Sequence, residues 1–404
     1  MRYATGYRLT MSEQVHYYGN VSILQAGLYK SMVAPLKIER IECVPLCMPL
    51  PRTFRGSYYY MTHRCTIITR IYTSAGVVGE VYNGDEFETQ AEVMKIVLDE
   101  IQPRLIGKDA FNIEGCWEEA RKPSYNILRD RKLAMCAQAC VDSAIWDTVG
   151  KALNVPLYKL WGGYRDRLPV ICIAGYYEEN KTLADFGREM EDIRAAGYSG
   201  CKFKVGGRTP KEDAERVKAA RRAVGDDFVL CVDANQGWTL REAVEFSRYT
   251  RDLNIRWFEE PVRWYNDRLD LAAARGQMGI PVTAGQSEIS RAGCRDLMMS
   301  GAIDVCNFDA SWGGGPTEWR RVAALAQSFT CEMGHHEEPQ ISAHLLSGIP
   351  NGTYLETFHP DRDPLFYALV ANRSKFDNGF YDVPQGAGFG LVLDEGTIRK
   401  YKVN

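Results

Sequence analysis

The sequence has little excess charge, no long apolar run and no Cys-x-x-Cys pair, and each absence excludes a class of protein. The formal net charge of -3 and the isoelectric point near 6.2 are close to neutral, so the composition implies no basic surface that would bind nucleic acid. No run approaches the roughly 18 to 20 apolar residues that span a membrane, and the N-terminus lacks a signal pattern, so we expect no membrane partner. No Gly-x-Gly-x-x-Gly follows an expected strand and opens a helix, which disfavours a Rossmann-type oxidoreductase.

The twelve cysteines are scattered, and none stands in the Cys-x-x-Cys spacing of zinc and redox sites. Several lie inside apolar runs, which indicates buried free thiols and a cytoplasmic protein rather than a disulfide framework. These cysteines are Cys172, Cys201, Cys231, Cys306 and Cys331.

The length and the 45% hydrophobic content predict two domains, one of them a barrel of about 250 residues. Residues 36–160 begin with strand-like runs typical of an antiparallel meander and continue into helices, so we interpret them as an α+β capping domain. Residues 161–356 are the expected barrel, and residues 357–404 are expected to return to the capping domain. Residues 1–35 lack periodicity and are either a disordered leader or a segment that precedes a start at Met32.

A loop between the first two expected strands, residues 51–63, is rich in tyrosine and arginine. It is interpreted either as a lid over a polar ligand or as an edge loop that packs on the neighbouring domain. If it is a lid, the substrate-binding candidates are Arg52, Arg55, Tyr58 and His63.

Three apolar runs between residues 200 and 260 each end in polar side chains, and amphipathic segments separate them at steps of about 30 residues. This rhythm is typical of βα units. In a barrel of parallel strands the carboxyl ends meet at one mouth, so Lys204, Asp233 and Glu259 are expected to converge. Later runs end in further candidates, namely Gln286 and Glu288, Asp309, His335 and His336, and Glu356.

Asp233 and Glu259 on neighbouring strands predict a site for a hard divalent cation. Magnesium prefers oxygen ligands in octahedral geometry and keeps positions open for water or substrate. The next strand offers the third ligand, either Gln286 or Glu288, because alternate residues of a strand share a face.

Two kinds of base flank this expected cation site. Lys202 and Lys204 point to the same side, and a neighbouring cation is expected to lower the pKa of such a lysine toward the range of a general base. His336 is expected to pair with Asp309, which would orient the imidazole. A cation between two bases suits removal of the proton α to a carboxylate, and a protonated Glu356 could donate a hydrogen bond to that carboxylate.

These residues resemble the motifs of the enolase superfamily, specifically its mandelate racemase subgroup, over nearly all of the chain from about residue 36. The superfamily is a known example of a Lys or His base working with magnesium on an ene-diolate. The matching motifs are Lys-x-Lys at 202–204, Val-Asp-Ala-Asn at 232–235, Glu-Glu-Pro at 259–261, Asp309 ahead of Gly-Gly, a seventh-strand histidine and Leu-Glu at 355–356. The implied fold is α/β, a modified TIM barrel (β/α)7β with an α+β capping domain.

The resemblance also implies catalytic roles. Lys204 resembles the base on one face of the substrate, with Lys202 close to the substrate carboxylate. His336 with Asp309 resembles the acid or base on the other face, and Glu356 resembles the electrophilic acid.

The spacing of the histidines distinguishes two neighbouring candidates. His336 stands eight residues before His344, which is similar to the racemase motif, so it is preferred to His335 as the catalytic histidine. His335 is kept as a substrate-binding candidate.

The resemblance implies a magnesium site with Asp233 and Glu259 as ligands, supported by Asn235 and Glu260. The chain departs from the family pattern at the fifth barrel strand, where Gly-Glu is replaced by Gly285-Gln286. An amide oxygen binds magnesium without contributing charge, so either the affinity is weaker or Glu288 reaches the ion.

The reaction implied by this resemblance is dehydration of an acid sugar, an aldonic or aldaric acid, to a 2-keto-3-deoxy acid. The same bases would serve a racemase or epimerase, which is one alternative. A second alternative is that Gln286 marks a barrel that has lost catalysis and only binds a ligand. The expected partner is a small-molecule carboxylate, and the resemblance implies a homo-oligomer, from dimer to octamer.

Overall fold

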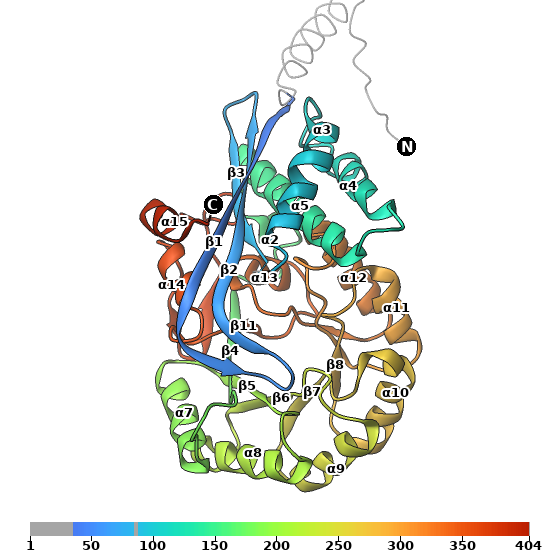
Figure 1. Ribbon diagram of the computed structural model, residues 1–404, viewed down its shortest axis with the longest axis vertical. Helices are drawn as coiled ribbons and strands as arrows, with labels where there is room; N and C mark the ends of the chain where they lie inside the picture. The colour runs from blue at the N-terminus through green and yellow to red at the C-terminus, as the bar shows by residue number, and fades with distance from the viewer. Residues whose placement is uncertain (1–34, 85–87, 404) are drawn as a thin grey trace, which may run out of the picture.

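The computed structural model describes residues 35–84 and 88–403, so the leader expected at residues 1–35 lies, apart from its last residue, outside this range. Figure 1 shows two parts, a capping domain of sheet and helices above a barrel ringed by helices. Among the described residues, no helix is long and apolar enough to cross a membrane.

The barrel consists of eight parallel strands that alternate with seven helices, which confirms the predicted (β/α)7β architecture. β11 pairs with β4, and a bridge from Met333 to Gly352 brings the chain ahead of β11 to β10. The strands are β4 (Arg167–Ala174), β5 (Gly200–Lys204), β6 (Val229–Asp233), β7 (Ile255–Glu259), β8 (Val282–Ala284), β9 (Val305–Cys306), β10 (Glu332–Met333) and β11 (Leu355–Thr357). The helices are α7 (Leu183–Ala195), α8 (Pro210–Val224), α9 (Leu240–Thr250), α10 (Asp267–Met278), α11 (Arg291–Met299), α12 (Pro316–Ser328) and α13 (Pro339–Ser347).

Local sequence explains how these units form. The barrel strands are short apolar runs that are buried on both faces, as expected of parallel strands covered by helices. Three helices begin with a threonine whose side chain accepts from the third helical backbone N–H, while an acidic residue there bonds back to the threonine. These capping boxes are Thr182 with Asp185, Thr209 with Glu212, and Thr239 with Glu242.

The capping domain is an antiparallel sheet in the order β1-β2-β3, as the meander pattern predicts. Its longest helix, α5, is buried along most of its length between this sheet and the barrel helix α12. The strands are β1 (Ile38–Arg55), β2 (Tyr60–Thr73) and β3 (Val78–Asn83). The helices are α2 (Gln90–Lys95), a π-helical turn (Ile96–Ile101), α3 (Gln102–Leu105), α4 (Ile113–Arg121), α5 (Arg131–Leu153) and α6 (Leu157–Leu160).

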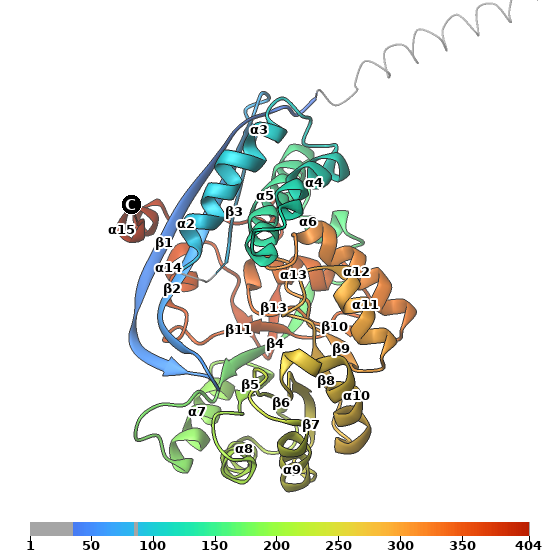
Figure 2. The same cartoon turned by 45° about the vertical axis from the view of Figure 1, so that its right-hand side comes forward.

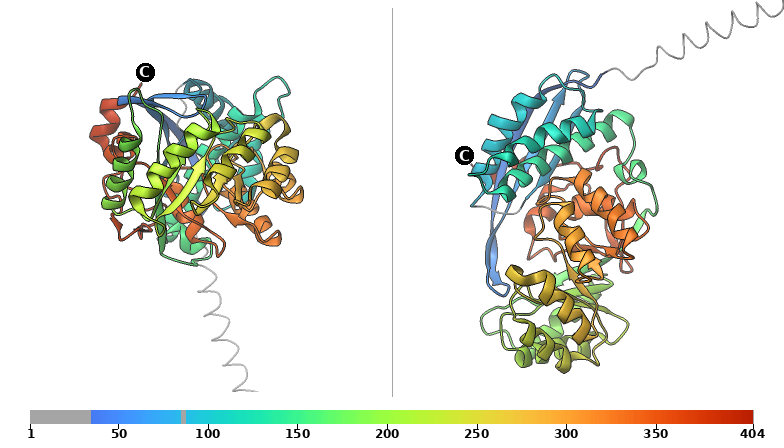
Figure 3. Two further views of the ribbon diagram at one scale, coloured as in Figure 1. Left: turned by 90° about the horizontal axis from the view of Figure 1, so that it is seen from below. Right: turned by 90° about the vertical axis from the view of Figure 1, so that its right-hand side faces the viewer.

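The β1–β2 hairpin is the feature of the capping domain that bears on function. Its strands continue past the sheet and bring the turn between them to the barrel near β5 and α7 (Figures 1 and 2). Backbone hydrogen bonds between Arg55 and Tyr177 fix this contact, and the side view of Figure 3 shows the hairpin spanning the two parts.

The C-terminal segment contacts both parts of the molecule. Its strand β13 (Phe380–Asp382) pairs antiparallel with β4 and with β12 (Phe376–Asp377). Its helices α14 (Pro364–Leu369) and α15 (Glu395–Tyr401) pack apolar side chains against β1 and β2. The domain limits placed at residues 160 and 356 stay predictions.

Candidate active site

A cavity of about 460 Å³ lies where the barrel mouth meets the β1–β2 hairpin. Barrel loops supply one part of its wall and the capping domain supplies another. The lining residues are Tyr59, Met61, Arg64, Glu88, Tyr176, Asn235, Gln236, Glu260, Gln286, Ser287, Trp312, His336 and Glu337.

A buried group of lysines and carboxylates adjoins this cavity. Strand register places Lys204 beside Asp233, and Asp233 beside Glu259, at the carboxyl ends of β5, β6 and β7. Lys204 Nζ donates to Asp233 Oδ2 at 2.6 Å and to Asn235 Oδ1, which faces the cavity, at 3.0 Å. Lys204, Asp233 and Glu259, which are far apart in sequence, therefore converge as the barrel prediction requires.

Lys202 joins the carboxylates deeper in the barrel. Its Nζ lies 2.8 Å from Glu259 Oε1, 2.7 Å from Glu356 Oε2 and 3.8 Å from Asp233 Oδ2, and the side chain is fully buried. The backbone N–H of Glu337 donates to the same Glu356 oxygen at 3.2 Å. Lys202, on β5, thus joins its own strand to three others, β6, β7 and β11.

The pKa values of both lysines differ from the sequence-based expectation of a lowered value. Burial acts to lower the pKa of Lys204, but the Asp233 carboxylate, Tyr59 and Glu259 outweigh burial and hold it well above its ordinary range. Burial likewise opposes the rise at Lys202, where Glu259, Glu356 and Asp233 raise the pKa. The expectation considered a neighbouring cation and missed the direct contact of each ammonium with carboxylates.

His336 follows β10. Around the barrel, β10 is three strands from β5, with β11 and β4 between them. Its Nδ1 lies 3.0 Å from Asp309 Oδ2, which fixes the ring with Nε2 toward Glu337 Oε1 at 3.5 Å. Trp312 packs against the imidazole at 5.1 Å between ring centroids. Burial, with Lys202 and Lys204 as further causes, holds the pKa of His336 well below its ordinary value, so the imidazole is neutral near pH 7.

The structure separates the two candidates for the third metal ligand. Gln286 follows β8, lines the cavity, and accepts a hydrogen bond at Oε1 from Asn307 Nδ2 at 3.0 Å. Glu288 does not line this cavity, and its Oε1 pairs with Arg268 Nη2 at 2.5 Å. Because β8 ends at Ala284, the alternation that would put both side chains on one face does not extend to them.

Backbone strain is concentrated around this mouth. Among the described residues, ten non-glycine residues have a left-handed φ, and five of them stand here. They are Asn235, Gln236, Glu260, Glu337 and Glu338. Such conformations cost about 1 to 3 kcal/mol each and gather at functional sites, where they aim side chains.

Glu260, predicted to support the metal ligands, lines the cavity beside Gln286. Its Oε1 accepts from Ser287 Oγ at 2.9 Å and from Gln236 Nε2 at 3.2 Å. Burial, and then the Asp233 charge, raise the pKa of Glu260 to about 7.

The five predicted substrate-binding residues do not line the cavity. Tyr58 is exposed, His63 contacts the hydroxyl of Thr62, and Arg55 lies over the ring of Tyr177. Arg52 belongs to a different cavity, and His335 is buried beneath the mouth. Their positions depend on how the hairpin lies on the barrel, which the composition of the loop does not reveal.

Both nitrogens of the His335 imidazole are engaged by the backbone. Nε2 accepts from the N–H of Ala310 at 3.1 Å, and Nδ1 lies 2.9 Å from the carbonyl of His336, an arrangement that suits a neutral ring. Burial lowers the pKa of His335 to about 4. Asp309, His335 and Glu338 are close enough to suggest a second metal site, but these backbone bonds give His335 a structural role instead.

Several residues of the cavity wall were not among the sequence-based candidates. They are Tyr59, Met61, Arg64, Glu88, Tyr176, Trp312 and Glu337, together with Gln236 and Ser287. Five of them stand one position from a candidate: Tyr59, Arg64, Gln236, Ser287 and Glu337.

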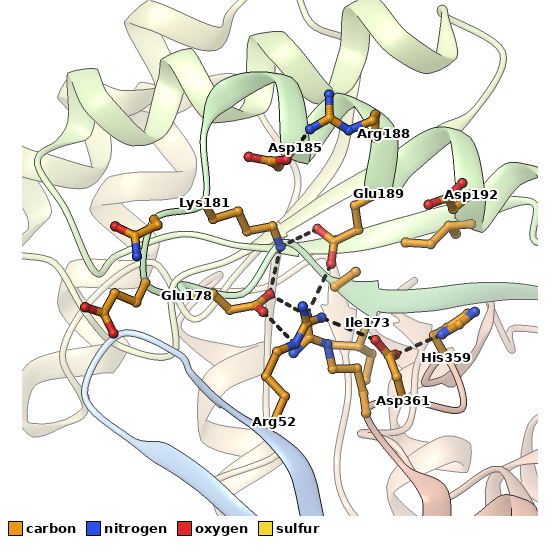
Figure 4. Close-up of a pocket in the computed structure, with 15 residues that line it drawn as sticks. Arg52, Ile173, Glu178, Lys181, Asp185, Arg188, Glu189, Asp192, His359 and Asp361 are labelled. Atoms are coloured by element: carbon orange, nitrogen blue, oxygen red, sulfur yellow. Dashed lines mark hydrogen bonds and ion pairs between the residues drawn. The ribbon is translucent and has the colours of Figure 1, made fainter.

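A second cavity, of about 440 Å³, lies outside the barrel mouth between the hairpin, α7 and the chain after β11. Figure 4 shows its ion pairs, in which Glu178 is held by Arg52, Lys181 and Arg362. Six carboxylates and four lysine or arginine side chains line it. We call it the outer cavity and the first one the mouth cavity.

A (β/α)7β barrel with lysine, carboxylate and histidine groups at its mouth and a separate capping domain defines the enolase superfamily. Residues 44–162 match the mandelate racemase / muconate lactonizing enzyme N-terminal domain, and residues 185–397 match the enolase C-terminal domain-like family. The chain therefore belongs to the mandelate racemase / muconate lactonizing enzyme family of this superfamily.

Solved and characterised relatives agree with this assignment. A mandelate racemase/muconate lactonizing enzyme from a marine actinobacterium, in complex with magnesium, is 51% identical, with a TM-score of 0.86 over 91% of this chain and 100% of its own. Arabinonate dehydratase of Saccharolobus solfataricus is 31% identical over 83% of this chain and 90% of its own. N-succinyl-L-Arg/Lys racemase of Bacillus cereus is 26% identical over 91% and 98%. The relatives are thus enzymes of more than one reaction class.

Proposed function

We propose that this protein is a magnesium-dependent acid sugar dehydratase that removes the proton α to a carboxylate and eliminates the β hydroxyl. The observation that carries the proposal is that His336 lines the mouth cavity, while Lys204 adjoins it through Asn235 and lies beside the carboxylates Asp233 and Glu259. The arabinonate dehydratase among its relatives supports the same reaction class.

The donor set fits magnesium. Asp233, Glu259 and Gln286 come from three consecutive strands or strand ends, and all offer oxygen, which this hard cation prefers. Gln286 Oε1 uses one lone pair on Asn307 and keeps a second for a cation. When bound there, magnesium supplies a Lewis acid that stabilises the negative charge developing on the substrate carboxylate.

The protein's own side chains move the protons. One of Lys204 and His336 takes the α proton, and the electron pair of that C–H bond enters the enediolate of the substrate. The β C–O bond then breaks, and the other residue protonates the departing hydroxyl, which leaves as water. Tautomerisation of the resulting enol gives the 2-keto-3-deoxy acid. Asp309 keeps the histidine ring oriented through Nδ1.

Lys202 and Glu356 are proposed to hold the substrate carboxylate. The Lys202 ammonium and the Glu356 carboxyl are in contact at 2.7 Å at the base of the site. A cation and a hydrogen-bonding acid at this place would stabilise the enediolate oxygens more than the ground-state carboxylate.

The test is an NMR screen of four- to six-carbon aldonic and aldaric acids with the purified protein and magnesium in D2O. A new 2-keto-3-deoxy product establishes the dehydratase. Deuterium at the α carbon without such a product identifies a racemase or epimerase instead, as the racemase relative would suggest. An α hydrogen that stays in place in every acid contradicts the proposal.

A further inference from the structure

The capping-domain hairpin and the loops after β9 and β10 form a chemically distinct part of the mouth cavity, which we call the distal wall. Tyr59, Met61 and Arg64 come from the hairpin, and Trp312 and Glu337 come from loops after β9 and β10. In the proposed function His336 acts on the α or β carbon of the substrate, and Glu337 Oε1 lies 3.5 Å from His336 Nε2, so the carbon chain of a bound substrate would pass along this wall.

Arg64 is the one lysine or arginine that lines the cavity within the described part of the chain, and it is already engaged. Its Nη1 lies 3.4 Å from Glu337 Oε2, its Nε donates to the carbonyl of Arg362 at 2.9 Å, and Phe358 covers its face at 4.0 Å. Only 4% of its surface is exposed. A second substrate carboxylate would therefore have to compete with Glu337 for it.

Glu337 gives the distal wall a negative charge beside the reactive histidine. Its Oε2 faces Arg64, and its Oε1 lies 3.5 Å from His336 Nε2. Its backbone φ of 52° is left-handed, an unfavourable conformation for glutamate, so the fold maintains this placement at a cost. Glu88 adds a second carboxylate to the lining. A carboxylate accepts strong hydrogen bonds from hydroxyl groups and repels another carboxylate.

Lys132 is a further cation close to this wall. It belongs to α5 and packs its ammonium over the Trp312 ring, 3.9 Å from the centroid, and it does not line the cavity. The distal wall is thus suited to a neutral chain of hydroxyl groups.

We infer that the mouth cavity selects monocarboxylic polyhydroxy acids, the aldonic acids, over dicarboxylic aldaric acids, and that Glu337 is the residue that rejects the second carboxylate. This inference rests on the proposed function. In it, Glu337 accepts hydrogen bonds from substrate hydroxyls, while its contact with Arg64 keeps that guanidinium from pairing with an anion.

The experiment compares matched pairs of aldonic and aldaric acids of the same configuration, with magnesium present. For the best pair, the wild type should favour the aldonic acid in kcat/KM by about 100-fold, because like charges at a binding site cost that much or more. Glu337→Gln should narrow this ratio about tenfold, because the amide removes the repulsion and frees Arg64. Glu191→Gln, on the exposed face of α7, is the matched loss of one negative charge and should leave the ratio unchanged.

A binding measurement removes the dependence on turnover. Calorimetry with Lys204→Ala and magnesium should show the aldonic acid binding about 100-fold more tightly than its aldaric partner. Equal or better binding and turnover of aldaric acids by the wild type overturns the inference and leaves the proposed dehydratase intact. If Glu337→Gln leaves the aldonic-to-aldaric ratio of kcat/KM unchanged, Glu337 is not the residue that rejects the second carboxylate. Absence of α exchange and of binding for every acid overturns the proposed function, and the inference with it.

Discussion

The mouth cavity and the outer cavity have almost the same volume, about 460 and 440 Å³, and both are rich in charge, yet their charges are arranged differently. In the outer cavity Glu178 is shared by Arg52, Lys181 and Arg362, so opposite charges neutralise one another where the wall is partly exposed. Beside the mouth cavity Lys202, Lys204 and their carboxylate partners are buried, and the neutral His336 lines its wall.

The difference shows that density of charge alone does not identify a reactive site. The exposed ion pairs of the outer cavity, such as Arg188 with Asp185 and Arg52 with Asp361, are worth little, about 0 to 1 kcal/mol each. Burial makes the same groups sensitive to a ligand's charge, because water no longer screens them. The left-handed residues Asn235, Gln236 and Glu337 mark the mouth cavity further, since the fold maintains them at a cost.

The largest expected effect is loss of a proposed base. Lys204→Ala and His336→Asn should each lower kcat by about 100- to 10,000-fold, because that is the typical contribution of a general acid or base. Lys181→Ala is the matched control in the outer cavity, where it removes an equally well-paired lysine, and kcat should change less than about twofold. NMR of the product gives the steady-state rate of all three variants. A large fall in kcat in Lys181→Ala would contradict the proposed difference between the two cavities.

A smaller effect concerns the third metal ligand. Gln286→Glu should tighten magnesium binding about tenfold, because it adds charge to the ligand set without changing its shape. Glu288→Gln should leave the affinity unchanged, because Arg268 holds that carboxylate away from the mouth cavity. Calorimetric titration with magnesium decides between them. Weaker binding in Glu288→Gln alone would make Glu288 the ligand.

The outer cavity should affect catalysis only through the hairpin. Arg52 joins the hairpin to Glu178 at 2.8 Å and to Asp361 at 3.4 Å, but the arginine is more than half exposed. Arg52→Ala should therefore raise KM about twofold and leave kcat unchanged, in line with the small worth of exposed pairs. A fall in kcat as large as that of Lys204→Ala would mean that the outer cavity takes part in the chemistry.

The smallest effect is an acid-dependent loss of stability at α7. Bonds from the Thr182 hydroxyl and backbone, and then Arg188, lower the pKa of Asp185 from 3.8 to about 2. A lowered carboxyl pKa stabilises the fold above its ordinary value, and this contribution is lost as the pH falls from about 4 to about 2. In Asp185→Asn, the melting temperature should be slightly lower at pH 7 and should fall less steeply between pH 4 and 2. Parallel melting curves for the two proteins over that range would contradict this assignment.

The sequence was most informative where strand register fixes geometry. Lys204, Asp233 and Glu259 end three neighbouring strands, so their convergence followed from the barrel alone, and the family motifs supplied the fold. Prediction was weaker where a strand ends. Past Ala284 the backbone turns, which separates Glu288 from Gln286.

The distal wall was beyond sequence reasoning for a different reason. The tip of the hairpin faces the barrel through contacts that are remote in sequence, so Tyr59 rather than Tyr58 enters the mouth cavity. Glu337 reaches it through a left-handed backbone that its residue type does not favour. The raised pKa of Lys204 likewise depended on the 2.6 Å contact with Asp233, which no pattern of residues reveals.

The most direct single measurement is α-hydrogen exchange into an aldonic acid in D2O, followed by NMR with the wild-type protein and magnesium and then with excess EDTA. The proposed mechanism predicts that the α-proton signal is lost with magnesium, accompanied by the 2-keto-3-deoxy product, and that EDTA stops both. An aldonic acid that binds at the mouth cavity but keeps its α proton in the presence of magnesium would contradict it.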